Sequence, residues 1–154
     1  MTATANASGT LVLETTKGEI RIAMLETIAP NHVARIKELA NDGFYDGIIF
    51  HRVIPGFMAQ TGDPDGTGMG GSGQNLKAEF SNYQYKYGTV GMARSMNPDS
   101  GDSQFFICFD GCSHLTGQYT VWGQVESGMD AVEAINAGEP PAEPDQIIKA
   151  SVEE

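Results

Sequence analysis

The chain has 154 residues, the size of one domain with a single substantial core, and its 40% hydrophobic and 19% charged residues are those of an ordinary soluble globular protein. Its 9 basic and 20 acidic residues give a formal net charge of −11, which should repel phosphate backbones and argues against nucleic acid as a direct partner. No apolar run reaches the ~18 residues of a membrane-spanning helix, which excludes such a span.

The N-terminal residues are small and polar. We expect residues 1–8 to form a flexible segment ahead of a single domain that spans residues 9–154. The segment has neither the positive charge nor the apolar stretch of a secretory signal. Because two cysteines are too few for a disulfide framework, the sequence predicts a cytoplasmic protein in a reducing environment.

Two strand-like runs, 11–14 and 19–24, are joined through residues 16–18, whose glycine can supply the turn of a β-hairpin. In the second run, three apolar residues fall on one face: Ile20, Ile22 and Met24. The sequence therefore begins with a hairpin that has one buried face.

The period then changes from two to that of a helix. Apolar residues recur at helical spacing from Pro30 to Asn41, with the proline suited to the first turn and Gly43 suited to the stop. This pattern predicts the first helix. We expect His32, near its start, to contact solvent.

The stretch from residue 48 to residue 63 organises the rest of the chain. Residues 48–54 read as a strand that places Arg52 on one side and His51 on the other, and Pro55-Gly56 then re-aims the chain. Two large apolar side chains and an amide follow, at Phe57, Met58 and Gln60. A cation beside an apolar patch is typical of a small recognition site, although a core strand with an incidental surface arginine explains the local pattern equally well.

A glycine-dense stretch, residues 66–73, matches G-x-G-x-x-G twice. A dinucleotide site would require an apolar strand before this motif and a helix after it, and the flanking residues predict neither. We therefore expect a flexible loop and reject the nucleotide interpretation.

The second half of the chain is also rich in strands. Short apolar or alternating runs predict strands at 88–93, 104–109, 119–125 and 145–152. A capping-box pattern at 127–130 predicts a second helix that ends at Gly138, and an extended connector, 139–144, follows it. Many strands with only two helices predict a mainly β protein with a closed barrel.

Metal and covalent chemistry find little support in the residues. Cys108, Cys112 and His114 are three possible ligands where a structural zinc takes four, and the apolar neighbours of Cys108 predict a buried structural thiol, so we expect no metal. Ser72 does not lie in a G-x-S-x-G elbow, and no histidine has a partner that the sequence can assign. We discard a covalent mechanism.

The segment 50–63, FHRVIPGFMAQTGD, resembles the signature of the cyclophilins, the peptidyl-prolyl cis-trans isomerases. Two further blocks, 103–108 (SQFFIC) and 114–123 (HLTGQYTVWG), occur in the order and spacing of that family, and the similarity runs from about residue 9 to about residue 152. The resemblance implies a closed barrel of eight antiparallel strands with a helix over each open end. It also implies isomerisation of X–Pro bonds, with no cofactor, by a monomer.

The resemblance also assigns the site. It gives Arg52 the role of catalytic donor and Gln60 the role of positioning it, and it places the residues preceding proline against the backbone of Ala93 and Arg94 and beside Gln104. The implied proline pocket consists of Phe57, Met58, Phe106 and Leu115. The expected partners are proline-containing peptides and unfolded or flexible protein segments. The alternative is a proline-peptide binding module or chaperone in which isomerisation is incidental, but a pure binder has no need of Arg52.

Three positions depart from the best-known family pattern. Where many members carry Trp, His and Asn, this chain has His114, Tyr119 and Arg94. Tyr119 can still form a wall of the pocket and keep a polar tip. His114 lacks the indole N–H and part of the apolar area, so we expect weakened binding of cyclosporin, the inhibitor of the family.

Overall fold

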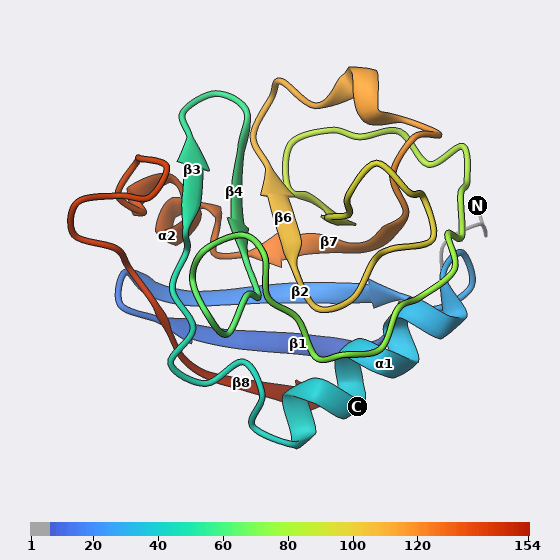
Figure 1. Ribbon diagram of the computed structural model, residues 1–154, viewed down its shortest axis with the longest axis horizontal. Helices are drawn as coiled ribbons and strands as arrows, with labels where there is room; N and C mark the ends of the chain where they lie inside the picture. Colours follow the sequence, from blue (N-terminus) through green and yellow to red (C-terminus); the bar gives the residue numbers. More distant parts are fainter. Residues whose placement is uncertain (1–6) are drawn as a thin grey trace.

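The computed structural model describes residues 7–154, and in this part of the chain it shows one eight-stranded sheet, two α-helices and one short 3₁₀ helix (Figure 1). Residues 1–6 of the predicted flexible segment lie outside the described residues, and the first strand begins at Ala7. The strands are β1 (Ala7–Thr15), β2 (Gly18–Leu25), β3 (Arg52–Ile54), β4 (Met58–Thr61), β5 (Thr89–Met92), β6 (Phe105–Cys108), β7 (Val121–Ser127) and β8 (Ile147–Glu153). The helices are α1 (Pro30–Asn41), η1 (Ser113–Leu115) and α2 (Met129–Ala134).

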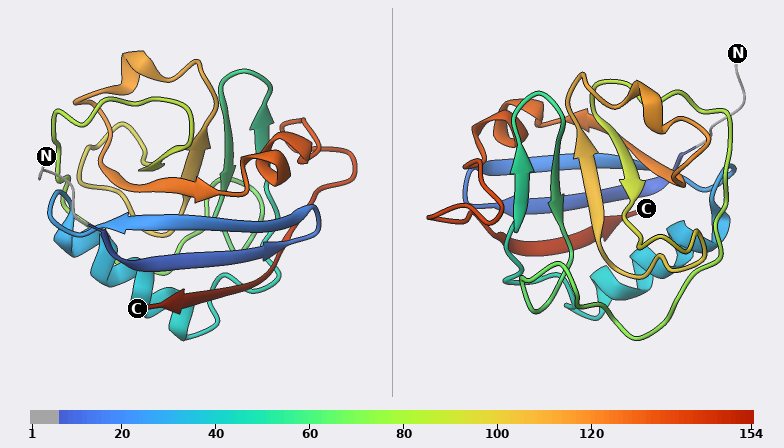
Figure 2. Two further views of the ribbon diagram at one scale, coloured as in Figure 1. Left: turned by 180° about the vertical axis from the view of Figure 1, so that it is seen from behind. Right: turned by 45° about the horizontal axis from the view of Figure 1, so that its top comes forward.

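The sheet is an open, curled half-barrel (Figure 2). Its order is β3-β4-β6-β5-β7-β2-β1-β8, and every neighbouring pair is antiparallel. The closed barrel predicted from the sequence is therefore wrong, because β3 and β8 lie at the two edges without a ladder between them.

The physical reason is that β3 is only three residues long and that the connector ahead of β8 is rich in proline, which has no N–H to donate. The segment just before β3 meets the start of β8 and the residues ahead of it instead. The N–H of Phe50 donates to the carbonyl of Asp145 (2.9 Å), and the N–H of Ile147 donates to the carbonyl of Ile48 (2.8 Å).

Helix α1 has the predicted bounds and turns its apolar face, with Val33, Ile36 and Leu39, into the core. The prediction that His32 contacts solvent is wrong, because its side chain is only 1% exposed. Glu79 explains the difference. Its carboxylate accepts the N–H of His32 (2.8 Å) and lies 2.5 Å from the Nδ1 atom of that residue, at the end of the helix that attracts negative charge.

Helix α2 is shorter than predicted and ends at Ala134. The predicted capping box does not form, because the residue that precedes the helix is Gly128, with φ 102° and no side-chain cap. A Cβ atom at Gly128 would also lie 2.8 Å from the Cα atom of Ile20, so glycine is required for close approach to β2. No helix within residues 7–154 is long and apolar enough to cross a membrane.

The side chains of β6 alternate between two apolar clusters. Phe105 and Ile107 belong to the main core, where Phe105 packs edge-to-face on Trp122 at 5.3 Å between ring centroids. Phe106 and Cys108 belong to a second cluster on the other face of the sheet. The three residues predicted to share the inner face of β2, Ile20, Ile22 and Met24, are fully buried in the main core.

The prediction that Cys108 is a free buried thiol is wrong. Cys108, at the end of β6, forms a disulfide with Cys112, and no free cysteine is present in the described part of the chain. The turn after β6 brings the two Cα atoms to 6.1 Å, a separation that a disulfide can span. The bond anchors the start of η1, which carries His114 and Leu115.

Candidate active site

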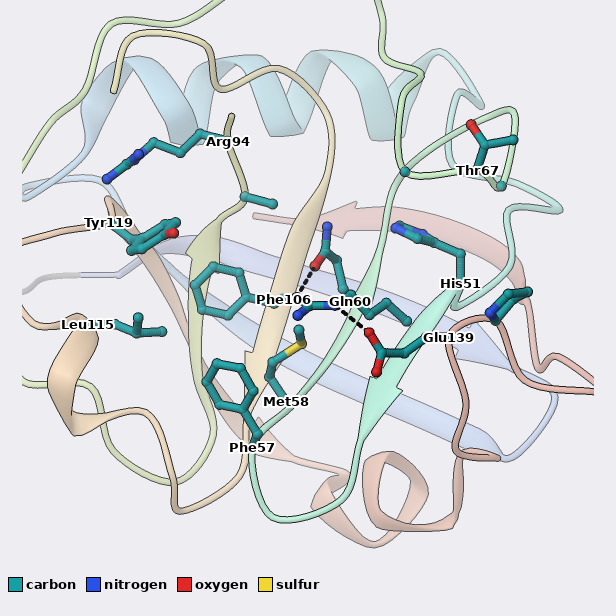
Figure 3. Close-up of a pocket in the computed structure, with 15 residues that line it drawn as sticks. His51, Phe57, Met58, Gln60, Thr67, Arg94, Phe106, Leu115, Tyr119 and Glu139 are labelled. Atoms are coloured by element: carbon teal, nitrogen blue, oxygen red, sulfur yellow. Dashed lines mark hydrogen bonds and ion pairs between the residues drawn. The ribbon is translucent and has the colours of Figure 1, made fainter. Parts of the chain in front are cut away.

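An open pocket of about 610 Å³ lies on the face of the sheet opposite the main core (Figure 3). Its walls come from β3, β4, β6 and the loops around them, so segments far apart in the sequence meet here. The lining residues are His51, Arg52, Phe57, Met58, Gln60, Gly66, Thr67, Gly68, Ala93, Arg94, Phe106, Leu115, Tyr119, Glu139 and Pro140.

The floor of the pocket is apolar. Phe106 packs edge-to-face on Tyr119 at 5.8 Å and stacks on the buried Tyr85 at 5.9 Å. Phe57 and Leu115 are half-buried in the same cluster, so they present apolar surface to the pocket. Such a slot suits a compact apolar ring that carries few polar groups.

Arg52 places its guanidinium beside this floor. Arg52 on β3 and Gln60 on β4 are direct cross-strand partners, and Arg52 Nη1 donates to Gln60 Oε1 at 3.4 Å. Arg52 Nε donates to Glu139 Oε1 at 3.1 Å. Gln60 and Glu139 therefore contact different nitrogen atoms of the guanidinium, and within residues 7–154 its Nη2 atom has no hydrogen-bond partner.

Gln60 is held by a second amide. Its Nε2 donates to Gln104 Oε1 at 2.9 Å, and Gln104 Nε2 donates to the carbonyls of Gly68 and Gly70, both at 3.0 Å. Each amide group is therefore oriented by its neighbour. The chain of contacts links Arg52 to the glycine-rich loop.

The glycine-rich loop that the sequence predicts to be flexible is organised around the buried carboxylate of Asp63. This carboxylate accepts the N–H groups of Asp65 (2.8 Å), Thr67 (2.9 Å) and Gly68 (2.5 Å). Burial alone would raise the pKa of Asp63, but the backbone donors outweigh it and hold that pKa below its ordinary value. A Cβ atom at Gly70 would overlap the same carboxylate, which explains the glycine there.

Arg94 and Tyr119, two of the three departures from the family pattern, lie against each other. The Cζ atom of Arg94 lies 4.3 Å from the centroid of the Tyr119 ring, and the guanidinium donates to the carbonyls of Ser95 (3.0 Å) and Gln118 (2.8 Å). Arg94 also lines an adjoining pocket of about 310 Å³, whose walls include Gln104. Ala93 and Arg94 thus line both pockets, whereas Gln104 lines only the adjoining one.

Of the residues that the sequence assigns to the site, Arg52, Phe57, Met58, Gln60, Ala93, Arg94, Phe106, Leu115 and Tyr119 line the main pocket. Gln104 lies behind Gln60 and lines the adjoining pocket instead. His114 is exposed and does not line either pocket, but its ring stacks on Phe57 at 5.7 Å between centroids. It therefore supports a residue of the pocket from outside.

Sequence reasoning missed His51, Glu139 and Pro140. The predicted alternation placed His51 on the far side of the strand from Arg52. However, β3 begins only at Arg52, so the side chain of His51 need not alternate with it, and both residues line the pocket. No local signal identifies Glu139 or Pro140, since they lie more than 80 residues away from Arg52 in the chain. Only the tertiary fold brings them to the pocket.

His51 does not supply a catalytic base with a partner. Neither of its ring nitrogens has a hydrogen bond within the described residues, and burial lowers its pKa, although Asp63 acts in the opposite direction. The described residues contain no group of three His, Cys, Asp or Glu side chains that could hold a metal ion. What the pocket does offer is an apolar slot with one guanidinium at its side.

Comparisons with known proteins agree with this geometry. A family model described as cyclophilin type peptidyl-prolyl cis-trans isomerase/CLD matches residues 10–152. A probable peptidyl-prolyl cis-trans isomerase of Brucella suis is 48% identical over 166 aligned positions, covering 97% of this chain and 85% of that protein. A peptidyl-prolyl cis-trans isomerase of Synechococcus elongatus is 45% identical, and the alignment covers 83% of this chain and 89% of that protein. One similar solved structure is the crystal structure of a cyclophilin type peptidyl-prolyl cis-trans isomerase of Cryptosporidium parvum in the presence of the dipeptide Ala-Pro. It has a TM-score of 0.87 at 26% sequence identity, and the match covers 94% of this chain and 99% of that chain.

Proposed function

The chain belongs to the cyclophilin-type peptidyl-prolyl cis-trans isomerases, and from this membership we propose that Arg52 is the group that accelerates rotation about the X–Pro bond. No covalent bond breaks in this reaction. The barrier of ~18–20 kcal/mol arises from the amide resonance that is lost when the bond twists. A catalyst therefore needs no nucleophile, and it has to bind the twisted amide more tightly than either planar isomer.

Arg52 has the chemistry that this task requires. When resonance is lost, the prolyl nitrogen becomes pyramidal and gains a lone pair that an N–H donor can stabilise. A guanidinium is permanently charged and presents its donors in a rigid plane. The observation that carries the proposal is that Arg52 lies at the side of the apolar slot with its Nη2 atom free of other partners in the described chain.

The substrate is held by the remaining residues of the pocket. Phe57, Met58, Phe106 and Leu115 grip the pyrrolidine ring, while Tyr119 forms the far wall. The residues before proline lie against the backbone of Ala93 and Arg94, next to Gln104. The crystal structure of the Cryptosporidium parvum relative in the presence of the dipeptide Ala-Pro supports a proline-containing peptide as ligand. We take unfolded and flexible protein segments as the natural form of that ligand.

The energies involved are within the range of preorganised electrostatics. A 10⁵-fold acceleration corresponds to about 7 kcal/mol of differential stabilisation. One preorganised donor aimed at developing charge contributes about 3–4 kcal/mol in enzymes where it has been removed. We therefore expect Arg52→Ala to lower kcat/KM by a factor of about 10²–10³.

The test is exchange across the X–Pro bond of a short peptide, measured by NMR with the wild-type protein and with Arg52→Ala. Fast exchange that collapses in the variant, while peptide chemical shifts still report binding, supports the assigned role of Arg52. Binding without enhanced exchange in the wild-type protein would favour the proline-binding module instead. A variant that exchanges the peptide at the wild-type rate would refute the role of Arg52.

Other properties rest on the sequence. The formal charge of −11 supports protein rather than nucleic-acid partners, and we propose a monomer. The cytoplasmic location stays a prediction based on the low cysteine count. The Cys108–Cys112 disulfide favours an oxidising compartment, so cell fractionation with thiol trapping decides between the two.

A further inference from the structure

We infer that Glu139 is a positioning residue, which fixes the orientation of the Arg52 guanidinium for the isomerisation; this inference rests on the proposed function. Glu139 lies in the proline-rich connector 139–144, far from Arg52 in the chain. Its carboxylate nevertheless accepts a hydrogen bond from Arg52 Nε at 3.1 Å and lines the same pocket (Figure 3).

The backbone places Glu139 in register with Arg52. Val53 and Gly138 form an isolated antiparallel bridge, in which the N–H of each donates to the carbonyl of the other (2.9 and 3.0 Å). In antiparallel pairing, the residue before Val53 lies opposite the residue after Gly138. Arg52 and Glu139 are therefore cross-strand neighbours, and their contact follows from the fold instead of from a chance meeting of two long side chains.

The bridge itself depends on a glycine. Gly138 has φ 146°, and a Cβ atom there would lie 2.8 Å from the carbonyl oxygen of Pro140. Only glycine accepts this backbone without strain. The sequence thus provides a tight turn that returns the connector to β3 and sets Glu139 beside the guanidinium.

The two partners of Arg52 act on different nitrogen atoms. Gln60 accepts from Nη1 at 3.4 Å, a long hydrogen bond that by itself leaves the guanidinium plane poorly defined. Glu139 adds a second point at Nε, and two points fix the plane and leave Nη2 without a hydrogen-bond partner in the described chain. Arginine otherwise has a flexible side chain, and a displacement of ~1 Å at a reacting group can cost as much as 10²-fold in rate.

The ion pair is exposed, so its value lies in orientation more than in stability. The side chains of Arg52 and Glu139 are 41% and 57% exposed, and pairs of this kind contribute little to folding. Replacing Glu139 should therefore change the rate without unfolding the protein.

The experiment compares Glu139→Ala and Glu139→Gln by NMR exchange and steady-state kinetics. Glu139→Ala should lower kcat by about 5–20-fold and leave KM within about twofold, since the contact is with the catalytic donor and not with the substrate. Glu139→Gln retains an acceptor oxygen without the charge and should restore kcat to within about threefold of the wild-type value. The matched control is Glu143→Ala, which removes one charge from the same connector at an exposed side chain and should leave both constants unchanged.

A double-mutant cycle separates this inference from the proposed function. In an Arg52→Ala background, Glu139→Ala should have no further effect, because there is no guanidinium left to orient. If the Arg52→Ala variant alone exchanged the peptide at the wild-type rate, the role of Arg52 itself would be overturned. Full loss in Arg52→Ala together with unchanged or raised kcat in Glu139→Ala would overturn only the positioning role.

The NMR signal of the Arg52 Nε–H group gives an independent readout. In the wild-type protein and in Glu139→Gln, the hydrogen bond should protect this group from exchange with water, and Glu139→Ala should remove the protection. Equal exchange rates in all three proteins would show that Glu139 does not hold the guanidinium.

Discussion

Gly91 on β5 lies directly beneath the floor of the pocket, and Gly91→Ala tests the packing of that floor. An added Cβ atom would lie 2.7 Å from Phe106 Cζ and would overlap the hydroxyl of Tyr85. Tyr85 is buried and its hydroxyl donates to the carbonyls of Tyr119 (3.0 Å) and Thr120 (3.3 Å), so it cannot turn away without losing these bonds. Phe106 must then move toward the pocket.

The expected cost of this overpacking is about 1–3 kcal/mol in the free energy of unfolding. We also expect kcat/KM to fall by about tenfold, mainly through KM, because the ring of Phe106 enters the space proposed for the pyrrolidine. Urea unfolding measures the first quantity, and peptide exchange at several substrate concentrations measures the second.

Gly123→Ala on β7 is the matched control. An added Cβ atom there would lie 2.6 Å from Ile22 Cγ2 in the main core, away from the pocket. It should therefore lose a similar ~1–3 kcal/mol while kcat/KM stays within about twofold. If Gly91→Ala and Gly123→Ala lowered stability equally but neither changed kcat/KM, the proposed coupling between Gly91, Phe106 and the pocket would be refuted.

Three further predictions concern the inhibitor, the pH dependence and the disulfide. His114→Trp should strengthen cyclosporin binding by roughly tenfold, because the larger ring would bury about 50 Å² more apolar surface. An unchanged affinity in a fluorescence titration would contradict this. The free energy of unfolding should decrease as the pH falls below about 6.5. Burial holds the pKa of His32 and of His51 below the ordinary value, so the unfolded chain takes up these protons first. Urea unfolding at several pH values measures this effect, and a flat profile would contradict it. Reducing the disulfide between Cys108 and Cys112, which are four positions apart, should lower the free energy of unfolding by about 2 kcal/mol, and identical urea midpoints with and without dithiothreitol would disprove that contribution.

Local features of the fold could be predicted from the sequence because their signals are local. The hairpin of β1 and β2 follows from alternation and a glycine turn, and α1 follows from helical spacing between Pro30 and Asn41. The end of α2 could not be predicted, because Ile135 continues the apolar spacing and is buried although the helix stops before it. Burial at that position is provided by tertiary packing and not by helical structure.

Closure of the barrel is a long-range property, and sequence patterns do not report it. Whether β3 and β8 pair depends on where the chain leaves the sheet at each edge. Here the segment before β3 meets the start of β8, and β3 itself meets the connector at Gly138. The disulfide was missed for a related reason: spacing alone does not show that the turn after β6 returns Cys112 to Cys108.

Most of the candidate site could be predicted because its residues occur in three contiguous blocks. Arg52 and Gln60 fall on paired strands of one hairpin, so their proximity follows from local structure. Glu139 could not be predicted, since it reaches Arg52 only through the bridge between Val53 and Gly138. Contacts of this kind depend on a register that no sequence motif encodes.

Because the side chains of β6 alternate, its four residues contribute to two different parts of the protein, the main core and the cluster under the pocket. Phe105 and Ile107 face the main core, whereas Phe106 and Cys108 face the cluster under the pocket. Selection for a new peptide preference can therefore act on Phe106, which lines the pocket, while selection for foldability acts on Phe105, Ile107 and the disulfide-bonded Cys108. A combinatorial library restricted to Phe106 on β6 and Met58 on β4, which line the pocket, would sample new specificities without disturbing the main core.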